Sequence, residues 1–477
     1  MSRKTLPRFQ FGGFQLPLKV RIQATKNVMS DAGPVSRALG LIAEVEPREV
    51  KAVVISFVYF FFLMASYFIL RPLRDTMGTV YGVAHLQELF TGTFLLSFVV
   101  APVFAGLASR IRLAVFLPWV YGFIAITMLL FYFLFQSDAN DRWIAAAFYV
   151  WLSTFNLLII SVFWSLMADI FSSAQAKRLF GFIAAGGTVG TISAPAFITL
   201  FVNAVGTNTL LLISAAGFTI TAFLVRLLEA EKRKLVATDE EAQKTTLDHR
   251  LGGNPFDGFM LLFRSPYLLM IALFVLLMTW ISTVIYFQLG DLISKEFASP
   301  AARTQAYASI DLATNSIAAL IQLFGTGRFI QRFGVTTALL LNPLIIVVAF
   351  LAVAFSPVLL VLGGVQVVRR VSEYAIAKPS RDMLFTVVDQ QSKYKAKNVI
   401  ETVIYRFGDL TSSWLSAAVL PFGVAGLAVL GIVIAACWFP IAWLLGRRYE
   451  NVPGGRLVDD PVIAAGRRST SSVGRHI

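Results

Sequence analysis

The sequence predicts an all-α integral membrane protein of twelve transmembrane helices, arranged as two similar six-helix halves. Three observations support this fold class. Apolar residues make up 57% of the chain and charged residues 14%, against about 45–50% and about 25% in soluble domains. Long apolar runs follow one another through most of the 477 residues. Finally, similar residues recur about 220 positions apart.

The first part of the chain divides into a tail and six apolar runs. Residues 1–49 are polar, basic and poor in acid. They lack the apolar core and small-residue cleavage site of a secretory signal, so we expect a cytoplasmic tail, with an organelle transit peptide as the alternative. A helix needs about 20 residues to cross a hydrocarbon core. Six runs of this length form the expected first half, 50–228: 50–78, 87–108, 113–135, 143–171, 179–203 and 209–228.

The second part repeats this plan after a linker of mixed charge, 229–265. The runs are too long for barrel strands, and helices satisfy their own backbone hydrogen bonds in lipid. A basic tail at 447–477 is expected to lie in the cytoplasm. Six more runs form the expected second half, 266–446: 266–294, 304–330, 334–354, 357–388, 396–419 and 422–446.

The positions of basic residues predict the orientation. Short cytoplasmic loops retain lysine and arginine, and these residues follow the even-numbered runs, with Arg142, Lys295 and Arg303 as exceptions. Both termini are therefore predicted to be cytoplasmic, and we expect the inner (cell) membrane of a bacterium. The net charge of +14 is explained by these loops and predicts no nucleic-acid partner. The basic residues concerned are Arg110, Arg112, Lys177, Arg178, Lys232, Arg233, Lys234, Arg328, Arg332, Lys393, Lys395, Lys397, Arg447 and Arg448.

An internal repeat relates the two halves. The pattern D-x6-A-K occurs from Asp169 to Lys177 and again from Asp389 to Lys397, 220 positions later. Secondary transporters are commonly built from such repeats. We interpret Asp169 and Asp389 as gating or inter-half residues at the cytoplasmic ends of the fourth and tenth runs. Further matches at 219 or 220 positions are Ser172 with Ser392, Tyr67-Phe68 with Tyr286-Phe287, and Gly106 with Gly325.

The first run contains Arg71, Arg74 and Asp75. Charges within a span are costly, so each needs water, a partner or a role. Arg71 and Arg74 share a helical face, and Asp75 can pair with Arg71 at i+4. A substrate or gating role is one interpretation. The alternative is an anchor at the outer membrane edge, because Arg71 comes about 30 Å along the helix.

The tenth run is unusually charged. Glu373 can pair with Arg369 or Arg370, and Pro379 should break the helix near Lys378. Broken helices are tolerated at membrane depth where they line a cavity. The alternative is a basic cytoplasmic segment, but the apolar stretch 357–368 is too short to span alone. The charges in this run are Arg369, Arg370, Glu373, Lys378, Arg381 and Asp382.

Two further runs contribute polar side chains. Arg406 and Asp409 in the eleventh run are spaced for an ion pair, and Asp311 shares a face with Asn315 in the eighth run. A structural network between the halves and a coupling-ion site explain these residues equally well. Glu401 and Gln322 complete the set.

The predominance of arginine and lysine predicts a small anionic solute, because guanidinium groups suit phosphate and carboxylate. We assign attraction of this solute to five residues: Arg71, Arg74, Lys378, Arg381 and Arg406. We assign gating or coupling to six residues: Asp75, Asp169, Glu373, Asp389, Asp409 and Asp311.

Cofactor chemistry is not predicted. The single cysteine, Cys437, excludes an internal disulfide, and the three histidines fit no metal spacing. The run from Gly181 to Gly190 lacks the lysine-serine ending of a phosphate loop. Its G-x-x-x-G pattern, Gly186 and Gly190, predicts close helix packing. We therefore expect neither an enzyme nor a metal or cofactor site.

Two short patterns carry a resemblance to a known family. The loop 106–112 keeps a glycine and two arginines, and the loop 327–334 reads G-R-F-I-Q-R-F-G. With the two six-helix halves, these loops resemble the major facilitator superfamily. The runs 70–75, L-R-P-L-R-D, and 163–181, which begins F-W and contains A-K-R-L-F-G, resemble the ATP/ADP translocases, nucleotide exchangers of plastids and intracellular bacteria. This chain departs from that branch in having no acidic residue in 143–168 or 266–290.

These observations favour a secondary transporter that moves a small anionic solute, such as a nucleotide, by alternating access. The resemblance implies nucleotide exchange. One alternative is a proton-coupled transporter of another small solute, and a second is a membrane scaffold that transports nothing. The lipid bilayer is the other expected partner, and we expect a monomer.

Overall fold

The described part of the computed structural model is helical and contains no strand. It comprises residues 45–46, 48–137, 141–236, 257–388 and 390–451. The helices of the first half are α3 (Val50–Tyr81), α4 (Leu86–Arg110), α5 (Leu113–Leu134), α6 (Asp141–Ile170), α7 (Ser173–Val205) and α8 (Thr207–Val236). One hydrophobic core, centred on α3, joins them.

The second half contains more helical segments because two of its helices change from α-helical to π-helical along their length. The first change is a π-helical turn at Glu373–Ala377, and the second is one at Ile400–Ile404. A separate core fills this half. Its helices are α9 (Asp257–Arg264), α10 (Pro266–Glu296), α11 (Pro300–Phe324), α12 (Thr326–Phe355), α13 (Leu359–Ser372), α14 (Lys378–Leu384), α15 (Gln390–Val399), α16 (Tyr405–Val419) and α17 (Gly423–Glu450).

The described residues include nine helical stretches long and apolar enough to cross a membrane. They correspond to ten of the predicted runs, because the last of them, Ala396–Glu450, contains the two predicted runs 396–419 and 422–446. The helices extend beyond several of the predicted apolar runs. Helix α8 continues to Val236 and α9 occupies part of the predicted linker, while α17 continues to Glu450. Charged residues mark the end of an apolar run, but the helix itself can continue beyond the membrane, because polar side chains are compatible with helix in water.

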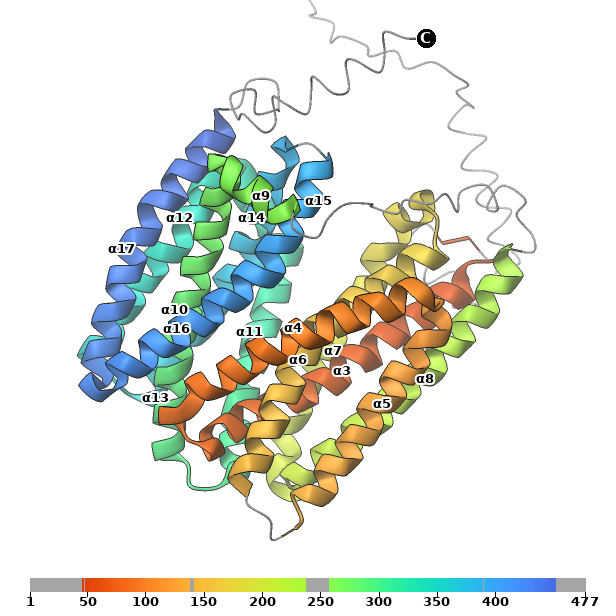
Figure 1. Cartoon of the computed structure of the whole chain (residues 1–477), viewed down its shortest axis with the longest axis horizontal. Helices are drawn as coiled ribbons and strands as arrows, with labels where there is room; N and C mark the ends of the chain where they lie inside the picture. The colour runs from red at the N-terminus through yellow and green to blue at the C-terminus, as the bar shows by residue number, and fades with distance from the viewer. Residues whose placement is uncertain (1–44, 47, 138–140, 237–256, 389, 452–477) are drawn as a thin grey trace, which may run out of the picture.

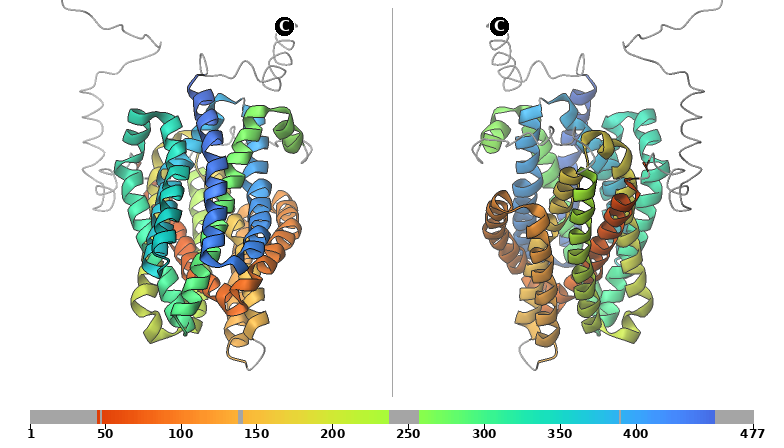
Figure 2. Two further views of the ribbon diagram at one scale, coloured as in Figure 1. Left: turned by 90° about the vertical axis from the view of Figure 1, so that its left-hand side faces the viewer. Right: turned by 90° about the vertical axis from the view of Figure 1, so that its right-hand side faces the viewer.

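The two halves meet along one end and separate towards the other (Figure 1). We call the end where α3 begins and α8 and α17 finish the linker end, and the opposite end the distal end. Helices α7 and α11 lie side by side at the boundary, as do α4 and α16. In the side views, helices of one half lie in front of those of the other (Figure 2).

Hydrogen bonds between the halves lie in the distal and middle parts of the described helices. Thr76 and Thr304 join α3 to α11 at 2.8 Å between their hydroxyl oxygens. The Trp414 indole donates to the Thr91 hydroxyl at 3.0 Å, which joins α16 to α4. Nearer the middle, Asn315 donates to the backbone carbonyl of Thr191 at 2.8 Å. The face shared by Asp311 and Asn315, predicted from the sequence, therefore points at the first half.

Close packing of α7 against α3 confirms the predicted role of the G-x-x-x-G pattern. A Cβ atom added at Gly186 would collide with the backbone carbonyl of Phe57, and one at Gly190 would lie 2.6 Å from the carbonyl oxygen of Phe61. Only glycine leaves room for two helix backbones at this separation. This contact makes α3 and α7 one packed unit within the first half.

In each half, a glutamate of the last helix accepts a hydrogen bond from the third helix or from the residue before it. Glu450 accepts hydrogen bonds from the Thr336 backbone N–H at 3.0 Å and from its hydroxyl at 2.6 Å. Gly334, with φ of 80°, breaks α12 just before this contact. In the first half, Glu229 accepts from Arg112 at 3.4 Å. Carboxylates are favourable at helix N-termini because of the helix dipole.

Candidate functional site

A buried carboxylate joins the two halves near the middle of the chain's helices. Asp311 on α11 accepts a hydrogen bond from the Arg370 guanidinium of α13. Its second oxygen, Oδ2, lies 3.7 Å from Nε of Arg71 on α3. Asp311 and Arg370 are both buried. One carboxylate is therefore shared by two guanidinium groups that come from opposite halves.

A second ion pair lies one helical turn along α3. Arg74 donates to Asp75, with Nη2 2.6 Å from Oδ1. The Tyr286 hydroxyl of α10 donates to the same oxygen at 3.1 Å, and this hydrogen bond links the Arg74–Asp75 pair of the first half to the second half. The Arg74 guanidinium lies over the Tyr149 ring, 5.4 Å from its centroid. The predicted i+4 pair of Arg71 with Asp75 was wrong, because each residue finds a closer partner.

Two further ion pairs follow the sequence predictions. Arg369 donates to Glu373 at 2.8 Å, which leaves Arg370 for Asp311. Arg406 lies 3.8 Å from Asp409. Arg406 also donates to the backbone carbonyl of Ser153 in the first half at 2.8 Å. The predicted pairing of Arg406 with Asp409 is confirmed.

The charges of this network do not balance. We name it the central network and define it as Arg71, Arg74, Asp75, Asp311, Arg369, Arg370, Glu373, Arg406 and Asp409. Arg74, Arg369 and Arg406 each have a carboxylate of their own. Arg71 and Arg370 share Asp311. The excess positive charge of the network therefore lies at Arg71 and Arg370.

Polar atoms at this position lack partners. Nε and Nη2 of Arg370 are buried and form no hydrogen bond within the described residues, and the same holds for Oδ2 of Asp311. Buried polar groups are normally paired, so such atoms call for an explanation. Donors that point from arginine into a protein interior are suited to bind a phosphate or carboxylate oxygen.

The π-helical turns place residues of the central network. Glu373 begins the first turn, which ends directly before Lys378 and Pro379. The break predicted near Lys378 is not found, because the chain stays helical from the π turn through Pro379 into α14. The second turn precedes Tyr405 and Arg406. Single π turns inside α-helices are frequent at functional sites.

The remaining predicted site residues lie towards the linker end. Arg381 is buried, 3.9 Å from Glu401. Asp382 pairs with Lys397 at 2.7 Å instead of with Lys378. Lys378 is exposed and, within the described residues, forms no ion pair. Asp169 is also exposed at the end of α6, and Asp389 lies outside the described residues.

The central network and the side chains that contact it include residues that the sequence prediction did not select. Arg370 was noted only as an alternative partner of Glu373. Tyr286 and Tyr149 were not selected, because tyrosine in an apolar run is typical of a packed core. Tyr286 did belong to a repeat match, but the match carried no chemistry. A signal for Arg370 existed, since one glutamate cannot neutralise two adjacent arginines.

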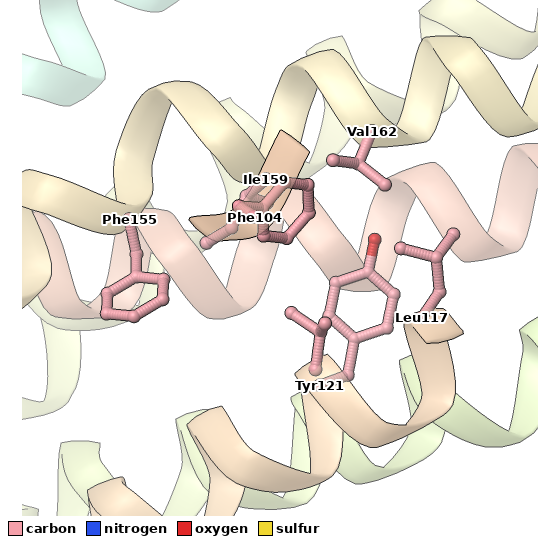
Figure 3. Close-up of a pocket in the computed structure, with 7 residues that line it drawn as sticks. Phe104, Leu117, Tyr121, Phe155, Ile159 and Val162 are labelled. Atoms are coloured by element: carbon pink, nitrogen blue, oxygen red, sulfur yellow. The ribbon is translucent and has the colours of Figure 1, made fainter. Parts of the chain in front are cut away.

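Two pockets of the described structure contain no charged side chain. The smaller, of about 10 Å³, lies between α4, α5 and α6 and is drawn in Figure 3. Its Tyr121 is hydrogen-bonded to Tyr59 at 2.6 Å. The larger, of about 340 Å³, is an apolar groove between α12 and α13. Neither adjoins the central network, so we assign neither a polar ligand.

At the linker end, the start of α3 is fixed to the start of α7. The buried Glu49 carboxylate accepts from Arg178 at 2.6 Å and from the Gln175 amide at 2.8 Å. Burial raises the pKa of Glu49, but the hydrogen bonds from Arg178, from the backbone of Glu46 and from Gln175 outweigh it. The pKa of this carboxyl is therefore lower than its ordinary value.

Glu49→Gln is expected to lower the free energy of unfolding by about 1–3 kcal/mol at neutral pH. The folded-state pKa is depressed, so this stabilisation is fully present above the unfolded pKa of about 4.3. It disappears as the pH falls through the lower folded pKa. Melting temperatures in detergent should thus differ by a constant amount from pH 8 to about pH 4.5 and converge below. The more exposed Glu46→Gln is the control, and a gap that widened in acid would contradict the assignment.

Comparison with known proteins decides the family. The family model of the Major Facilitator Superfamily matches residues 46–370. The chain belongs to this superfamily. As a member of the Major Facilitator Superfamily, it is a membrane transporter of that type, as its apolar helices and two halves indicate.

Relatives and solved structures agree with this assignment. "ADP,ATP carrier protein 1" of Chlamydia muridarum is 23% identical over 457 residues, which cover 81% of this chain and 85% of the relative. The nucleoside transporter NupG has the same fold, with a TM-score of 0.55, 16% identity and coverage of 85% of this chain and 100% of that one. A bacterial homolog of the human lysosomal transporter Spinster, in an inward-facing, unoccupied conformation, gives a TM-score of 0.56 at 13% identity, covering 87% and 99%.

Proposed function

We propose that this chain transports a small anionic solute of the nucleotide type across a bacterial inner membrane by alternating access. The single observation that carries the proposal is the charge imbalance of the central network. Two arginines from opposite halves share one carboxylate, and Arg370 retains buried donors without partners. An anion bound between Arg71 and Arg370 would contact both halves at once, as a transported substrate must.

We further propose twelve spans, with the linker end in the cytoplasm. Helix α11 and the segment α13–α14, which contains a π turn, add two spans to the nine apolar stretches. The stretch Ala396–Glu450 contains two antiparallel spans divided near Gly423, which brings the count to twelve. Helix α11 is less apolar because it lies between the halves. The distribution of loop lysines and arginines supports the orientation. With this orientation, the hydrogen bonds between the two halves near the distal end correspond to a conformation that is closed to the outside.

The relatives supply the substrates to test first. The curated relatives are named as ADP,ATP carriers, and a phosphate group matches the arginine donors of the central network. The absence of acidic residues from 143–168 and 266–290 distinguishes this chain from the translocase pattern, so phosphate and carboxylate compounds belong in the same test.

The test is uptake by purified protein in lipid vesicles, with radiolabelled ATP, ADP, inorganic phosphate and a dicarboxylate as separate probes. We expect saturable uptake of at least one phosphorylated probe, competed by unlabelled nucleotide. An imposed pH gradient, compared with preloaded internal nucleotide, separates proton coupling from exchange. Empty vesicles provide the background. Transport only of cations or neutral sugars would contradict an anionic substrate, and no transport of any solute would favour a scaffold.

A further inference from the structure

The Asp311 carboxylate binds the two arginines that we assign to the substrate anion. It is the carboxylate that Arg71 and Arg370 share, and it comes from α11, a helix packed against the first half. Two buried guanidinium groups without a counter-ion are costly in a membrane protein. Asp311 removes this cost when no other anion is present. It also occupies one of the donors that an anion would need, Nη1 of Arg370.

The structure provides Asp311 with a second position. The Tyr307 hydroxyl, four residues before it on α11, is buried and forms no hydrogen bond within the described helices. The Thr314 hydroxyl, three residues after it, is likewise buried without a partner there. Residues at these spacings lie on the same helical face. The Thr314 hydroxyl can donate to the Asp311 carboxylate once it leaves the arginines, whereas the Tyr307 hydroxyl lies toward Gly290 on α10.

We propose that Asp311 takes the place of the transported anion in the empty carrier, and that a substrate anion displaces it from Arg71 and Arg370. This inference rests on the proposed function, since it needs an anionic substrate. The empty carrier keeps one carboxylate between its two arginines and can therefore return across the membrane without cargo. The wild-type protein consequently performs net transport as well as exchange.

The first experiment measures the two modes on the wild-type protein. Vesicles loaded with unlabelled ATP report exchange, and vesicles without nucleotide report net uptake, with labelled ATP outside in both cases. We expect comparable initial rates in the two modes. Inorganic phosphate serves as the second probe, because it presents the same oxygens without a base. Exchange without net uptake would overturn the role of Asp311 while leaving the proposed function intact.

The second experiment replaces Asp311 with asparagine. In the D311N variant, exchange should persist and net uptake should be lost, because the empty carrier now has two unneutralised arginines. Binding of ATP, measured by its shift of the melting temperature in detergent, should be tighter by roughly tenfold or more, since the competing carboxylate is gone. Asp291→Asn, in an exposed pair with Lys295 outside the central network, is the control and should retain both modes.

The outcomes separate this inference from the proposed function. The inference would be overturned if D311N melted as the wild type does but lost exchange and net uptake equally. It would also be overturned if D311N bound ATP more weakly than the wild type. Should D311N not melt cooperatively, the ratio of the two modes in the wild-type protein decides alone. A wild-type protein that moves neither ATP, ADP nor phosphate would overturn the proposed function, and the inference with it.

Discussion

Replacing Arg370 with glutamine is expected to weaken anion binding by roughly 10- to 100-fold and to reduce transport correspondingly. Arg370 supplies the unpaired buried donors of the central network, and its loss leaves Asp311 with Arg71 alone, 3.7 Å away. The excess positive charge disappears with it. Uptake by reconstituted vesicles over a range of probe concentrations measures the effect as a change in apparent affinity and maximal rate.

The same variant should also be less stable, because breaking a buried ion pair by removing one partner costs about 3–5 kcal/mol. A melting curve in detergent must therefore accompany each uptake measurement. Arg332→Gln, which removes an exposed arginine on α12, is the matched control for loss of one positive charge. Wild-type apparent affinity in a folded R370Q protein would show that the anion does not bind at this position.

Adding one methyl group at Gly186 is expected to destabilise the packing of α7 against α3. The Cβ of G186A would meet the backbone carbonyl of Phe57, which cannot move without separating α3 from α7. Overpacking of this kind costs about 1–3 kcal/mol. Gly181 on the same helix has no atom within 4 Å of an added Cβ, and G181A should be neutral or slightly stabilising, since alanine favours helix over glycine by about 1 kcal/mol.

The measurement is the unfolding transition of both variants in detergent, followed under identical conditions. A difference between G186A and G181A tests packing directly, because the chemical change is the same in each. Equal transitions for the two variants would show that α3 and α7 do not approach as closely as the glycines indicate. Transport by G186A should fall in proportion to the folded fraction and keep its apparent affinity for the probe.

Patterns local to one helix could be predicted from the sequence, and partners across the halves could not. The spacing of Arg406 and Asp409 and the glycines of α7 refer to neighbours at fixed helical offsets, so both predictions were correct. Asp75 failed as a partner of Arg71 because a residue 240 positions away, Asp311, lies nearer in space. No periodicity within one helix contains that information.

The ends of helices showed a different limit. Hydropathy marks where an apolar run stops, but α8 and α17 continue as helix into charged sequence. The glycine at 334 marked a true break in α12, with positive φ, within residues that otherwise remain helical. The exposed position of Lys378 also depends on the orientation of α14, which follows from the π turn before it and not from residue spacing.

The two π turns bear on the ancestry of the halves. A π turn closes a hydrogen bond over one residue more than an α turn does. Before the first turn, Gly106 and Gly325 match 219 positions apart, while Asp169 and Asp389, beyond it, match at 220. Glu450, beyond the second turn, follows Glu229 by 221 positions. The second half thus behaves as a duplicate that acquired single-residue insertions, absorbed as wide turns beside Glu373 and Arg406.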